Sequence, residues 1–301
     1  MTAPPSIAII GAGAIGGSVA GALGDAGNQV TLCVRTRFKQ LRVDVESSSA
    51  RYGHPVVSDA SIVDPVDWLL LCTKAHQVEG AADWFAHLLS ESTRVAVLQN
   101  GVEHGQRVAP YLSGDNRVLP CVVRLPATVV EPGHIVQNRR GRLQVPAGET
   151  GSEFAGLFAG QDNIVVELVD DLTSAAWDKL VRNAISGICA VTRQTMGVLR
   201  RETTRDLVLG LIAEIKAVGE AEGAIFSENL IDEFFASYEG LTGSLWTSIA
   251  QDAVAGRPME WDARNAVVGR IGRKHNIPTP LNDALTTMLQ LADEANRNST
   301  K

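Results

Sequence analysis

Residues 7–16 read IAIIGAGAIG, and this stretch decides the fold of the first part of the chain. Its first four residues form a continuous apolar run, typical of a strand that is buried on both faces of a parallel sheet. Glycines follow at positions 11, 13 and 16, which is the spacing GxGxxG, and small and apolar residues then recur at helical spacing. The stretch therefore predicts a strand, a glycine-rich turn and a helix in direct succession.

Each glycine of this turn has a separate physical task. Gly11 permits the tight turn, Gly13 lets the backbone approach a pyrophosphate closely, and Gly16 allows the helix to pack on the strand. The first N–H groups of the helix lack partners within the helix, so they attract phosphate. We therefore predict a dinucleotide site at Gly11, Ala12, Gly13, Ala14, Ile15 and Gly16. A glycine-rich turn that holds no ligand is the alternative.

The end of the second predicted strand, residues 30–34, indicates which dinucleotide binds. NAD-binding domains usually carry Asp or Glu there, about 20 residues after the glycines, to accept hydrogen bonds from the ribose hydroxyls. This chain carries Arg35 and Arg37 instead. Because a guanidinium pairs well with the 2′-phosphate of NADP, we expect NADPH rather than NADH. The alternative is that both arginines are solvated charges at a strand end.

Strand and helix patterns continue beyond this point. Buried-strand runs recur at residues 68–72 and 95–98, and a helix-like stretch at 77–89 separates them. This alternation predicts a doubly wound parallel sheet, the Rossmann arrangement. Short β-like runs between residues 118 and 166, separated by glycine turns, predict hairpins that extend the same domain.

The rest of the chain is predicted to be helical. Apolar residues mark one helical face from Trp177 to Ile188. Further helices are expected at residues 203–222, 229–239, 244–255, 261–275 and 280–295. The fold class is therefore α/β, with an N-terminal doubly wound Rossmann domain at residues 1–170 and a C-terminal all-helical domain at residues 171–301.

Charge and cysteine content exclude several classes of protein. The chain has 27 basic and 34 acidic residues, a net charge of −7, and its longest basic cluster, residues 139–142, is too short for a nucleic-acid surface. The cysteines are widely spaced, which favours neither a metal site nor a disulfide framework, and no membrane-spanning run or secretory leader is apparent. We expect a cytoplasmic protein without nucleic acid, membrane or metal as partners. Its cysteines are Cys33, Cys72, Cys121 and Cys189.

Several later motifs stand in an order that resembles the ketopantoate reductase family. They are Cys72-Thr73-Lys74-Ala75, Gln99-Asn100-Gly101, Trp177-Asp178-Lys179-Leu180 followed by Asn183, Ser248-Ile249-Ala250-Gln251-Asp252 leading to Glu260-Trp261-Asp262, and the segment 272–280. The resemblance covers nearly the whole chain and is more specific than the glycine turn alone. It implies a Rossmann domain, a helical domain that completes the active site, and NADPH-dependent reduction of 2-dehydropantoate to pantoate on the route to coenzyme A.

The resemblance also implies residue roles. Lys179 matches a general acid toward the ketone oxygen, and Glu260 matches a carboxylate that holds the substrate hydroxyl. Asn183 matches a polar substrate ligand, and Ser248 matches a contact to the substrate carboxylate. Asn100 matches a residue near the nicotinamide ribose and the substrate.

Two basic residues match the positions that meet the adenosine 2′-phosphate in the family, namely Arg35 and Lys74. The expected partner is a small 2-oxo acid, and a homodimer is one expected assembly.

The residues themselves support only part of this assignment. Lys179 and Asn183 are four positions apart on a predicted helix, so they project from one face and can converge on one ligand. A lone lysine on an amphipathic helix is nevertheless most often a surface residue. Glu260 can also be read as a carboxylate in the first turn of a helix, where the helix dipole favours it.

Three positions depart from the family pattern. Gly187 stands where a second asparagine is usual, Thr247 replaces a serine, and Ile249 replaces a methionine. Loss of an asparagine removes hydrogen-bonding groups from the substrate side. A homologous reductase of another 2-oxo acid or carbonyl is therefore the main alternative. A non-catalytic NADPH-binding sensor is a third hypothesis, although retention of Lys179 and Glu260 disfavours it.

Overall fold

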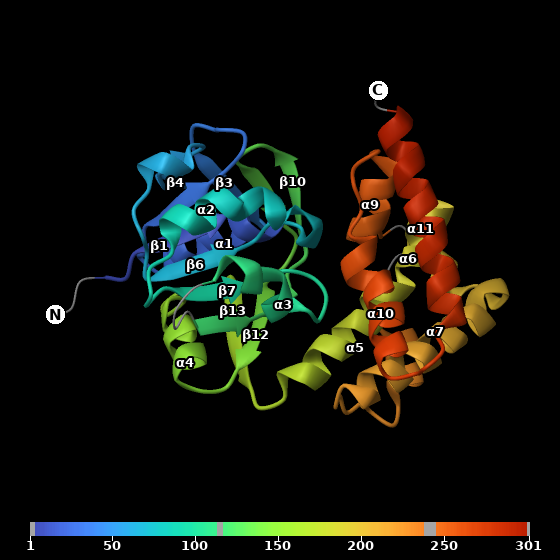
Figure 1. Cartoon of the computed structure of the whole chain (residues 1–301). Helices are drawn as coiled ribbons and strands as arrows, with labels where there is room; N and C mark the ends of the chain where they lie inside the picture. The colour runs from blue at the N-terminus through green and yellow to red at the C-terminus, as the bar shows by residue number, and fades with distance from the viewer. Residues whose placement is uncertain (1–3, 113–116, 238–244, 300–301) are drawn as a thin grey trace. The chain divides into compact units, whose positions relative to one another are not determined.

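The computed structural model describes residues 4–112, 117–237 and 245–299, and the chain divides into two compact units (Figure 1). The first unit contains Met1–Gln99 and Glu103–Leu172. The second contains Thr173–Lys301 together with Asn100–Val102. Val102 packs against the apolar core of the helices, which explains why this short segment groups with the second unit.

A six-stranded parallel sheet forms the centre of the first unit. Its strand order is β5-β2-β1-β6-β7-β8, and all neighbouring strands run parallel. The strands are β1 (Ile7–Ile10), β2 (Val30–Cys33), β5 (Val56–Val57), β6 (Trp68–Leu71), β7 (Arg94–Val97) and β8 (Arg117–Pro120). The predicted Rossmann sheet is confirmed.

Strand β1 shows why a continuous apolar run was required. Ile7 and Ile9 belong to the core that includes helix α1 (Ala14–Asp25). Ala8 and Ile10 belong to a separate core on the other face, which includes helix α2 (Ala82–Leu88). Successive side chains of a strand point to opposite faces, so a strand covered on both sides must be apolar throughout.

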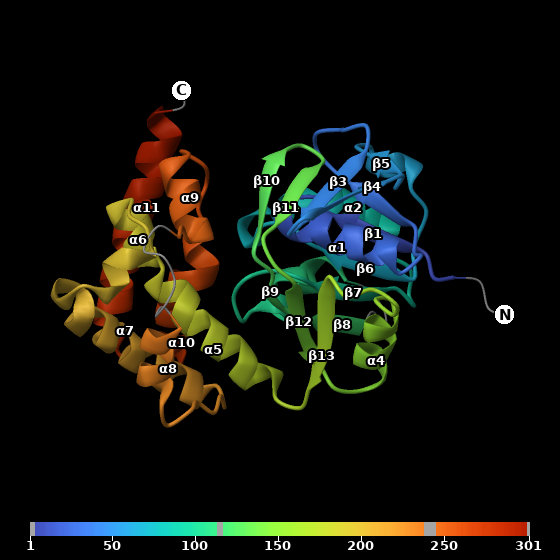
Figure 2. The ribbon, with the colours of Figure 1, turned by 180° about the vertical axis from the view of Figure 1, so that it is seen from behind.

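A second sheet packs against α1 with the order β10-β11-β3-β4 (Figure 2). Its strands are β3 (Leu41–Val45), β4 (Ser48–Tyr52), β10 (Ala127–Glu131) and β11 (His134–Gln137). Gly17 and Gly21 let this sheet approach α1, because ideal Cβ atoms there would lie 2.5 Å from Ile135 and 2.9 Å from Val43. The sequence prediction did not include β3 and β4.

The prediction of hairpins between residues 118 and 166 is only partly correct. Strands β10 and β11 form an antiparallel pair, but β8 belongs to the parallel sheet. Strand β12 (Gly141–Pro146) pairs parallel with β13 (Ile164–Val169) and antiparallel with β9 (Val122–Arg124). Helix α4 (Glu149–Gly156) connects β12 to β13, since parallel neighbours require a crossover rather than a tight turn.

Short helices complete the first unit. They are η1 (Ala60–Ile62), η2 (Ala75–Gln77), η3 (Glu79–Ala81), α3 (His104–Val108) and η4 (Ala109–Tyr111). All four cysteines of the chain are buried, and none of them forms a disulfide. In the basic cluster 139–142, Arg140 pairs with Asp162 and Arg142 pairs with Glu167.

In the part of the second unit that the structure describes, the regular secondary structure is helical, as predicted. They are α5 (Leu172–Ile185), α6 (Gly187–Thr192), η5 (Met196–Arg200), α7 (Glu202–Ala221), α8 (Leu230–Ala236), α9 (Ser248–Val254), the π-helical turn η6 (Asp262–Ala266), α10 (Val267–Lys274) and α11 (Pro280–Ser299). The parts of the predicted helices at residues 238–239 and 244 lie outside the described residues.

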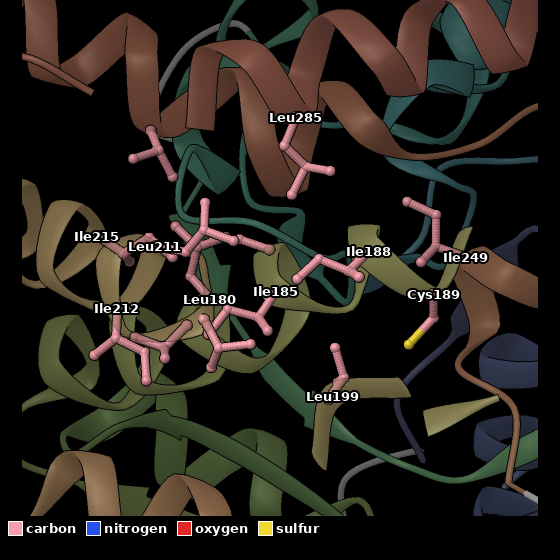
Figure 3. Packing of buried hydrophobic residues seen from close by; sticks show 14 of the residues in the cluster. Leu180, Ile185, Ile188, Cys189, Leu199, Leu211, Ile212, Ile215, Ile249 and Leu285 are labelled. Carbon is pink, nitrogen blue, oxygen red and sulfur yellow. The ribbon is translucent and has the colours of Figure 1, made fainter. Parts of the chain in front are cut away.

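The core of the helical unit is assembled from several helices (Figure 3). Leu180 and Ile185 of α5 pack with Ile188 of α6, Leu211 of α7 and Leu285 of α11. The apolar face that the sequence indicated for residues 177–188 is therefore buried, and the opposite face of α5 remains available for polar groups. Among the described helices, none combines the length and apolar character needed to span a membrane.

Candidate functional site

The glycine turn lies between β1 and α1, and two of its glycines are required by neighbouring protein atoms. Gly11 has φ +94°, and its N–H donates to the Cys33 carbonyl oxygen at 3.0 Å. An ideal Cβ at Gly16 would lie 2.0 Å from the Gly11 carbonyl oxygen. Side chains at these positions would therefore distort the turn itself.

Gly13 differs from both of these glycines. It is exposed, has φ −77°, and an ideal Cβ there would meet no atom within 4 Å. No internal contact therefore requires glycine at this position, which directly precedes the first turn of the 12-residue helix α1. Open space before a helix N-terminus fits the approach of a phosphate group to the backbone. The turn thus suits a dinucleotide pyrophosphate.

The sheet order accounts for the two basic residues predicted beside this turn. Strand β1 lies between β2 and β6, and all three run parallel, so the segments that follow them emerge at one edge. Arg35 follows β2 and is exposed, and Lys74 follows β6 and is half-buried. Nearby Arg37 donates to the Val56 carbonyl oxygen at 3.1 Å. Arg35 and Lys74 therefore follow the two strands that flank β1.

Gln99 fixes the segment that precedes Lys74. It is only 2% exposed, and its Nε2 donates at 3.0 Å to both the carbonyl oxygen and the Oγ1 of Thr73. His104 contacts the Gln99 carbonyl oxygen at 3.0 Å. In the sequence analysis Gln99 lay within a motif but had no predicted role, because the partners of its side-chain amide are 25 or more residues away along the chain.

A second cluster lies within the helical unit and has Asn100 at its centre. Asn100 Oδ1 accepts hydrogen bonds from Lys179 Nζ at 3.0 Å and from Asn183 Nδ2 at 3.3 Å. Asn100 Nδ2 donates to Glu260 Oε2 at 3.0 Å. The structure therefore brings together four of the five residues that the resemblance associated with substrate and catalysis.

Helix α5 positions the two donors. Lys179 and Asn183 lie one helical turn apart, which places both side chains on the same face. The intervening residues Leu180 and Val181 are buried in the apolar core, so the helix cannot rotate without exposing them. The rotation of α5 thus directs both donors toward Asn100.

Ser248 joins this cluster through a residue that sequence reasoning missed. Ser248 is the first residue of α9, whose N-cap Thr247 accepts a hydrogen bond from Ala250 N–H at 3.3 Å. Arg264 donates from Nη2 to Ser248 Oγ at 2.8 Å, and the same nitrogen lies 3.6 Å from Glu260 Oε2. The only sequence signal for Arg264 was its position four residues after Glu260.

Together these side chains form one polar chain of contacts, which we call the Asn100 network: Lys179, Asn183, Asn100, Glu260, Arg264 and Ser248. The network contains two basic side chains and one acidic side chain. Basic donors suit an anionic substrate with a carbonyl oxygen, and a carboxylate can accept from a substrate hydroxyl. The arrangement can therefore bind a hydroxylated oxo acid and donate a proton to it.

Gly187 does not face the Asn100 network in this structure. An ideal Cβ at this position would lie 3.0 Å from Leu289 Cδ1 and 3.3 Å from both Leu285 Cδ2 and Asn265 Oδ1. Its surroundings are therefore largely apolar and belong to the packing of α11.

Comparison with known proteins yields full-length similarities. Residues 7–150 match the family model described as Ketopantoate reductase PanE/ApbA, and residues 171–293 match its C-terminal model. The chain is 38% identical to the 2-dehydropantoate 2-reductase of Caulobacter vibrioides, over 95% of this chain and 99% of that protein.

Solved structures agree with the sequence matches. The crystal structure of a PanE/ApbA family ketopantoate reductase from Ralstonia eutropha matches with a TM-score of 0.88 and 29% identity, over 97% of this chain and 99% of that one. A dimeric ketopantoate reductase from Staphylococcus aureus matches with a TM-score of 0.85 and 26% identity, with the same coverage of both chains.

Proposed function

We propose that the protein is an NADP-dependent oxidoreductase that reduces 2-dehydropantoate to pantoate. The premise is that the chain belongs to the ketopantoate reductase family. The observation that carries this proposal is the Asn100 network, in which an amine, an amide and a carboxylate all bond to the side-chain amide of Asn100. Nucleotide binding alone requires none of these side chains. Their association supports a catalytic protein rather than a sensor.

The first domain, residues 1–170, is proposed to hold NADPH. Residues 11–16 would contact the pyrophosphate, and Arg35 and Lys74 would contact the 2′-phosphate of the adenosine. The exposed open space at Gly13 and the exposed position of Arg35 support this assignment. When bound, the cofactor supplies the hydride that the ketone carbon accepts.

The second domain, residues 171–301, is proposed to carry the catalytic side chains, together with Asn100. Lys179 Nζ donates a proton to the ketone oxygen, which gains negative charge during reduction. The ketone thereby becomes an alcohol: the hydride forms the new C–H bond, and the proton forms the new O–H bond. Asn100 Oδ1 orients the Lys179 amine through the 3.0 Å hydrogen bond.

The remaining residues of the network are proposed to orient the substrate. Glu260 accepts a hydrogen bond from the substrate hydroxyl, and Asn183 donates to a substrate oxygen from the same face of α5 as Lys179. Ser248 contacts the substrate carboxylate. Glu260 is only 8% exposed, so its hydrogen bonds are protected from competition with water.

A reductase of a different 2-oxo acid is the second candidate; the replacement of the family's usual asparagine by Gly187 suggests it, but the packing of position 187 against Leu285 and Leu289 of α11 weakens that argument. The proposal also includes a cytoplasmic location, which four buried cysteines without a disulfide support. A homodimer is proposed by analogy with the dimeric relative from Staphylococcus aureus, and analytical ultracentrifugation tests it.

The experiment that tests the function is a screen of 2-oxo acids in which the loss of NADPH absorbance is followed. We expect the highest kcat/KM with 2-dehydropantoate. A much higher value with another 2-oxo acid would favour the second candidate. Tight NADPH binding without oxidation by any acid would favour the sensor.

A further inference from the structure

Arg264 is a buried cation beside two residues of the proposed substrate site. Its side chain is 4% exposed, and it contacts Ser248 Oγ at 2.8 Å and Glu260 Oε2 at 3.6 Å. Its Nε is buried and has no hydrogen-bond partner within the described part of the chain. A guanidinium has five N–H donors, and burying such a charge is costly unless acceptors surround it. Arg264 therefore has donor capacity that the described contacts leave unused.

The local backbone around Arg264 is also unusual. Residues 262–266 form a π-helical turn, a rare conformation that occurs frequently at functional sites. Within this turn Asn265 is fully buried, and its Nδ2 donates to the Ala184 carbonyl oxygen of α5 at 2.9 Å. This bond ties the turn to the helix that carries Lys179 and Asn183. The turn thus fixes the Arg264 backbone relative to the proposed catalytic lysine.

The position of Arg264 suggests which part of a substrate it meets. It lies between Glu260, proposed to hold the substrate hydroxyl, and Ser248, proposed to contact the substrate carboxylate. A substrate carboxylate next to Ser248 would be repelled by Glu260 alone, and an interposed guanidinium removes that repulsion. A planar guanidinium also matches a carboxylate with two parallel hydrogen bonds.

We propose that Arg264, together with Ser248, binds the carboxylate of the 2-oxo acid and gives the site its preference for charged over neutral carbonyl compounds. This inference rests on the proposed function. Arg264 is thus a specificity-determining residue, distinct in role from the proton donor Lys179.

The test compares 2-dehydropantoate with its neutral amide in the native protein and in Arg264→Gln and Arg264→Lys. In Arg264→Gln we expect kcat/KM for the acid to fall about tenfold to hundredfold, the loss of one charge-assisted contact, and kcat/KM for the amide to change by less than about threefold. For the acid, kcat/KM of Arg264→Lys should lie between the values of the native protein and Arg264→Gln, because lysine keeps the positive charge but lacks the planar guanidinium that forms two parallel hydrogen bonds. NADPH affinity should be unchanged in both variants.

Arg270→Gln is the matched control. Arg270 lies six residues closer to the C-terminus, is about half exposed, and pairs with Asp262 at 3.0 Å. This variant should reduce both substrates at the native rate. An equal loss for acid and amide in Arg264→Gln would overturn the inference, since it would show that Arg264 only positions Glu260 and Ser248.

Removal of one partner of a buried ion pair destabilises proteins, so Arg264→Gln can fail to fold. In that case the native protein and Arg264→Lys decide. A native kcat/KM that is at least about tenfold higher for the acid, reduced in Arg264→Lys, supports the inference. Equal native values for acid and amide overturn it while the reductase function stands. Absence of reduction for every 2-oxo acid removes the proposed function and the inference together.

Discussion

The glycine turn and the Asn100 network are built in opposite ways. The turn is shaped by backbone contacts, such as the Gly11 N–H bond to Cys33, and a Cβ added at Gly13 would meet no atom within 4 Å. In the network, side chains from residues as far as 160 positions apart already bond to one another. The fold of the turn should therefore tolerate substitutions that leave its backbone intact, even where they weaken ligand binding. The network should be sensitive to the loss of any one member, because its partners would lose a buried bond.

The largest effect is expected from Lys179→Ala. A positioned general acid typically contributes 10²–10⁴ in rate, so turnover should fall by about that factor. NADPH affinity should stay the same, because the glycine turn belongs to the other unit. Stopped-flow measurement of NADPH oxidation and fluorescence titration of NADPH binding separate the two quantities.

Lys216→Ala is the control for this substitution. Lys216 is also a helical lysine of the second unit, is about half exposed, and pairs with Glu220 within α7. It should keep native turnover. Nearly full activity in Lys179→Ala would show that Lys179 is not the general acid and that the Asn100 network is no more sensitive to substitution than the glycine turn.

Two glycine variants test the same comparison in the glycine turn. Gly13→Val should weaken NADPH binding about a hundredfold or more without loss of thermal stability, because its side chain enters open space that the pyrophosphate needs. Gly16→Val should lower the melting temperature, since its side chain collides with the Gly11 carbonyl oxygen. Calorimetric titration and differential scanning calorimetry measure these effects. Native NADPH affinity in a folded Gly13→Val would contradict the dinucleotide assignment.

A smaller effect is expected at the strand-end arginines. Arg35→Glu should raise the KM for NADPH about tenfold to hundredfold and change the KM for NADH little, because only NADPH carries the 2′-phosphate. Arg37→Glu should have a weaker effect, since Arg37 already donates to the Val56 carbonyl oxygen. Steady-state kinetics with both cofactors give the ratio. Equal efficiency of the native protein with NADPH and NADH would count against Arg35 as the selecting residue.

The smallest effect concerns the support of α1 behind the glycine turn. Burial lowers the pKa of His54 below its usual value of 6.5, and the neutral ring accepts from Val30 N–H at 3.4 Å and contacts the Ala20 carbonyl oxygen at 2.9 Å. The depressed pKa favours the neutral form in the folded state. Its contribution to stability is therefore present above pH 6.5 and declines as the pH falls below that value.

Urea unfolding at a series of pH values tests this effect. The free energy of unfolding should decline on acidification below pH 6.5, and the decline should be smaller in His54→Gln. Exposed His87→Gln should leave the decline unchanged. Hydrogen bonds from Ser49, His134 and Arg42 hold the pKa of the Asp44 carboxyl well below its usual value of 3.8, so the stability that this group contributes is present throughout the pH range near 6.5 and is lost only at much more acidic pH. An identical decline in His54→Gln and in the native protein would exclude His54 as the source.

The first region could be predicted from sequence because its information is local. Ten consecutive residues, 7–16, specify β1, the turn and the start of α1. The buried face of α5 could also be predicted, because helical periodicity is a short-range pattern. The association of Lys179 with Asn100, 79 residues away, followed only from the family resemblance.

What the sequence did not reveal depends on long-range pairing. The apolar runs of β12 and β13 are compatible with a hairpin or with parallel strands, and only α4 between them decides. Strand β3 pairs with β4 next to it in the chain, but it also pairs with β11, and residues of this pair such as Asp44 and His134 are 90 positions apart, a partnership that no local pattern encodes. The helix predicted at residues 261–275 gave Arg264 no role, and only the folded structure, with its π-helical turn, places it buried beside Ser248 and Glu260.

The central claim is that the chain transfers a hydride from NADPH to the ketone carbon of 2-dehydropantoate. The most direct test is to incubate the protein with 2-dehydropantoate and NADPH that carries two deuterium atoms at C4 of the nicotinamide, and to analyse the product by mass spectrometry and NMR. The account predicts pantoate with one deuterium bonded to C2, formed in equal amount to the NADPH consumed. NADPH consumption without deuterated pantoate, or no consumption at all, would contradict it.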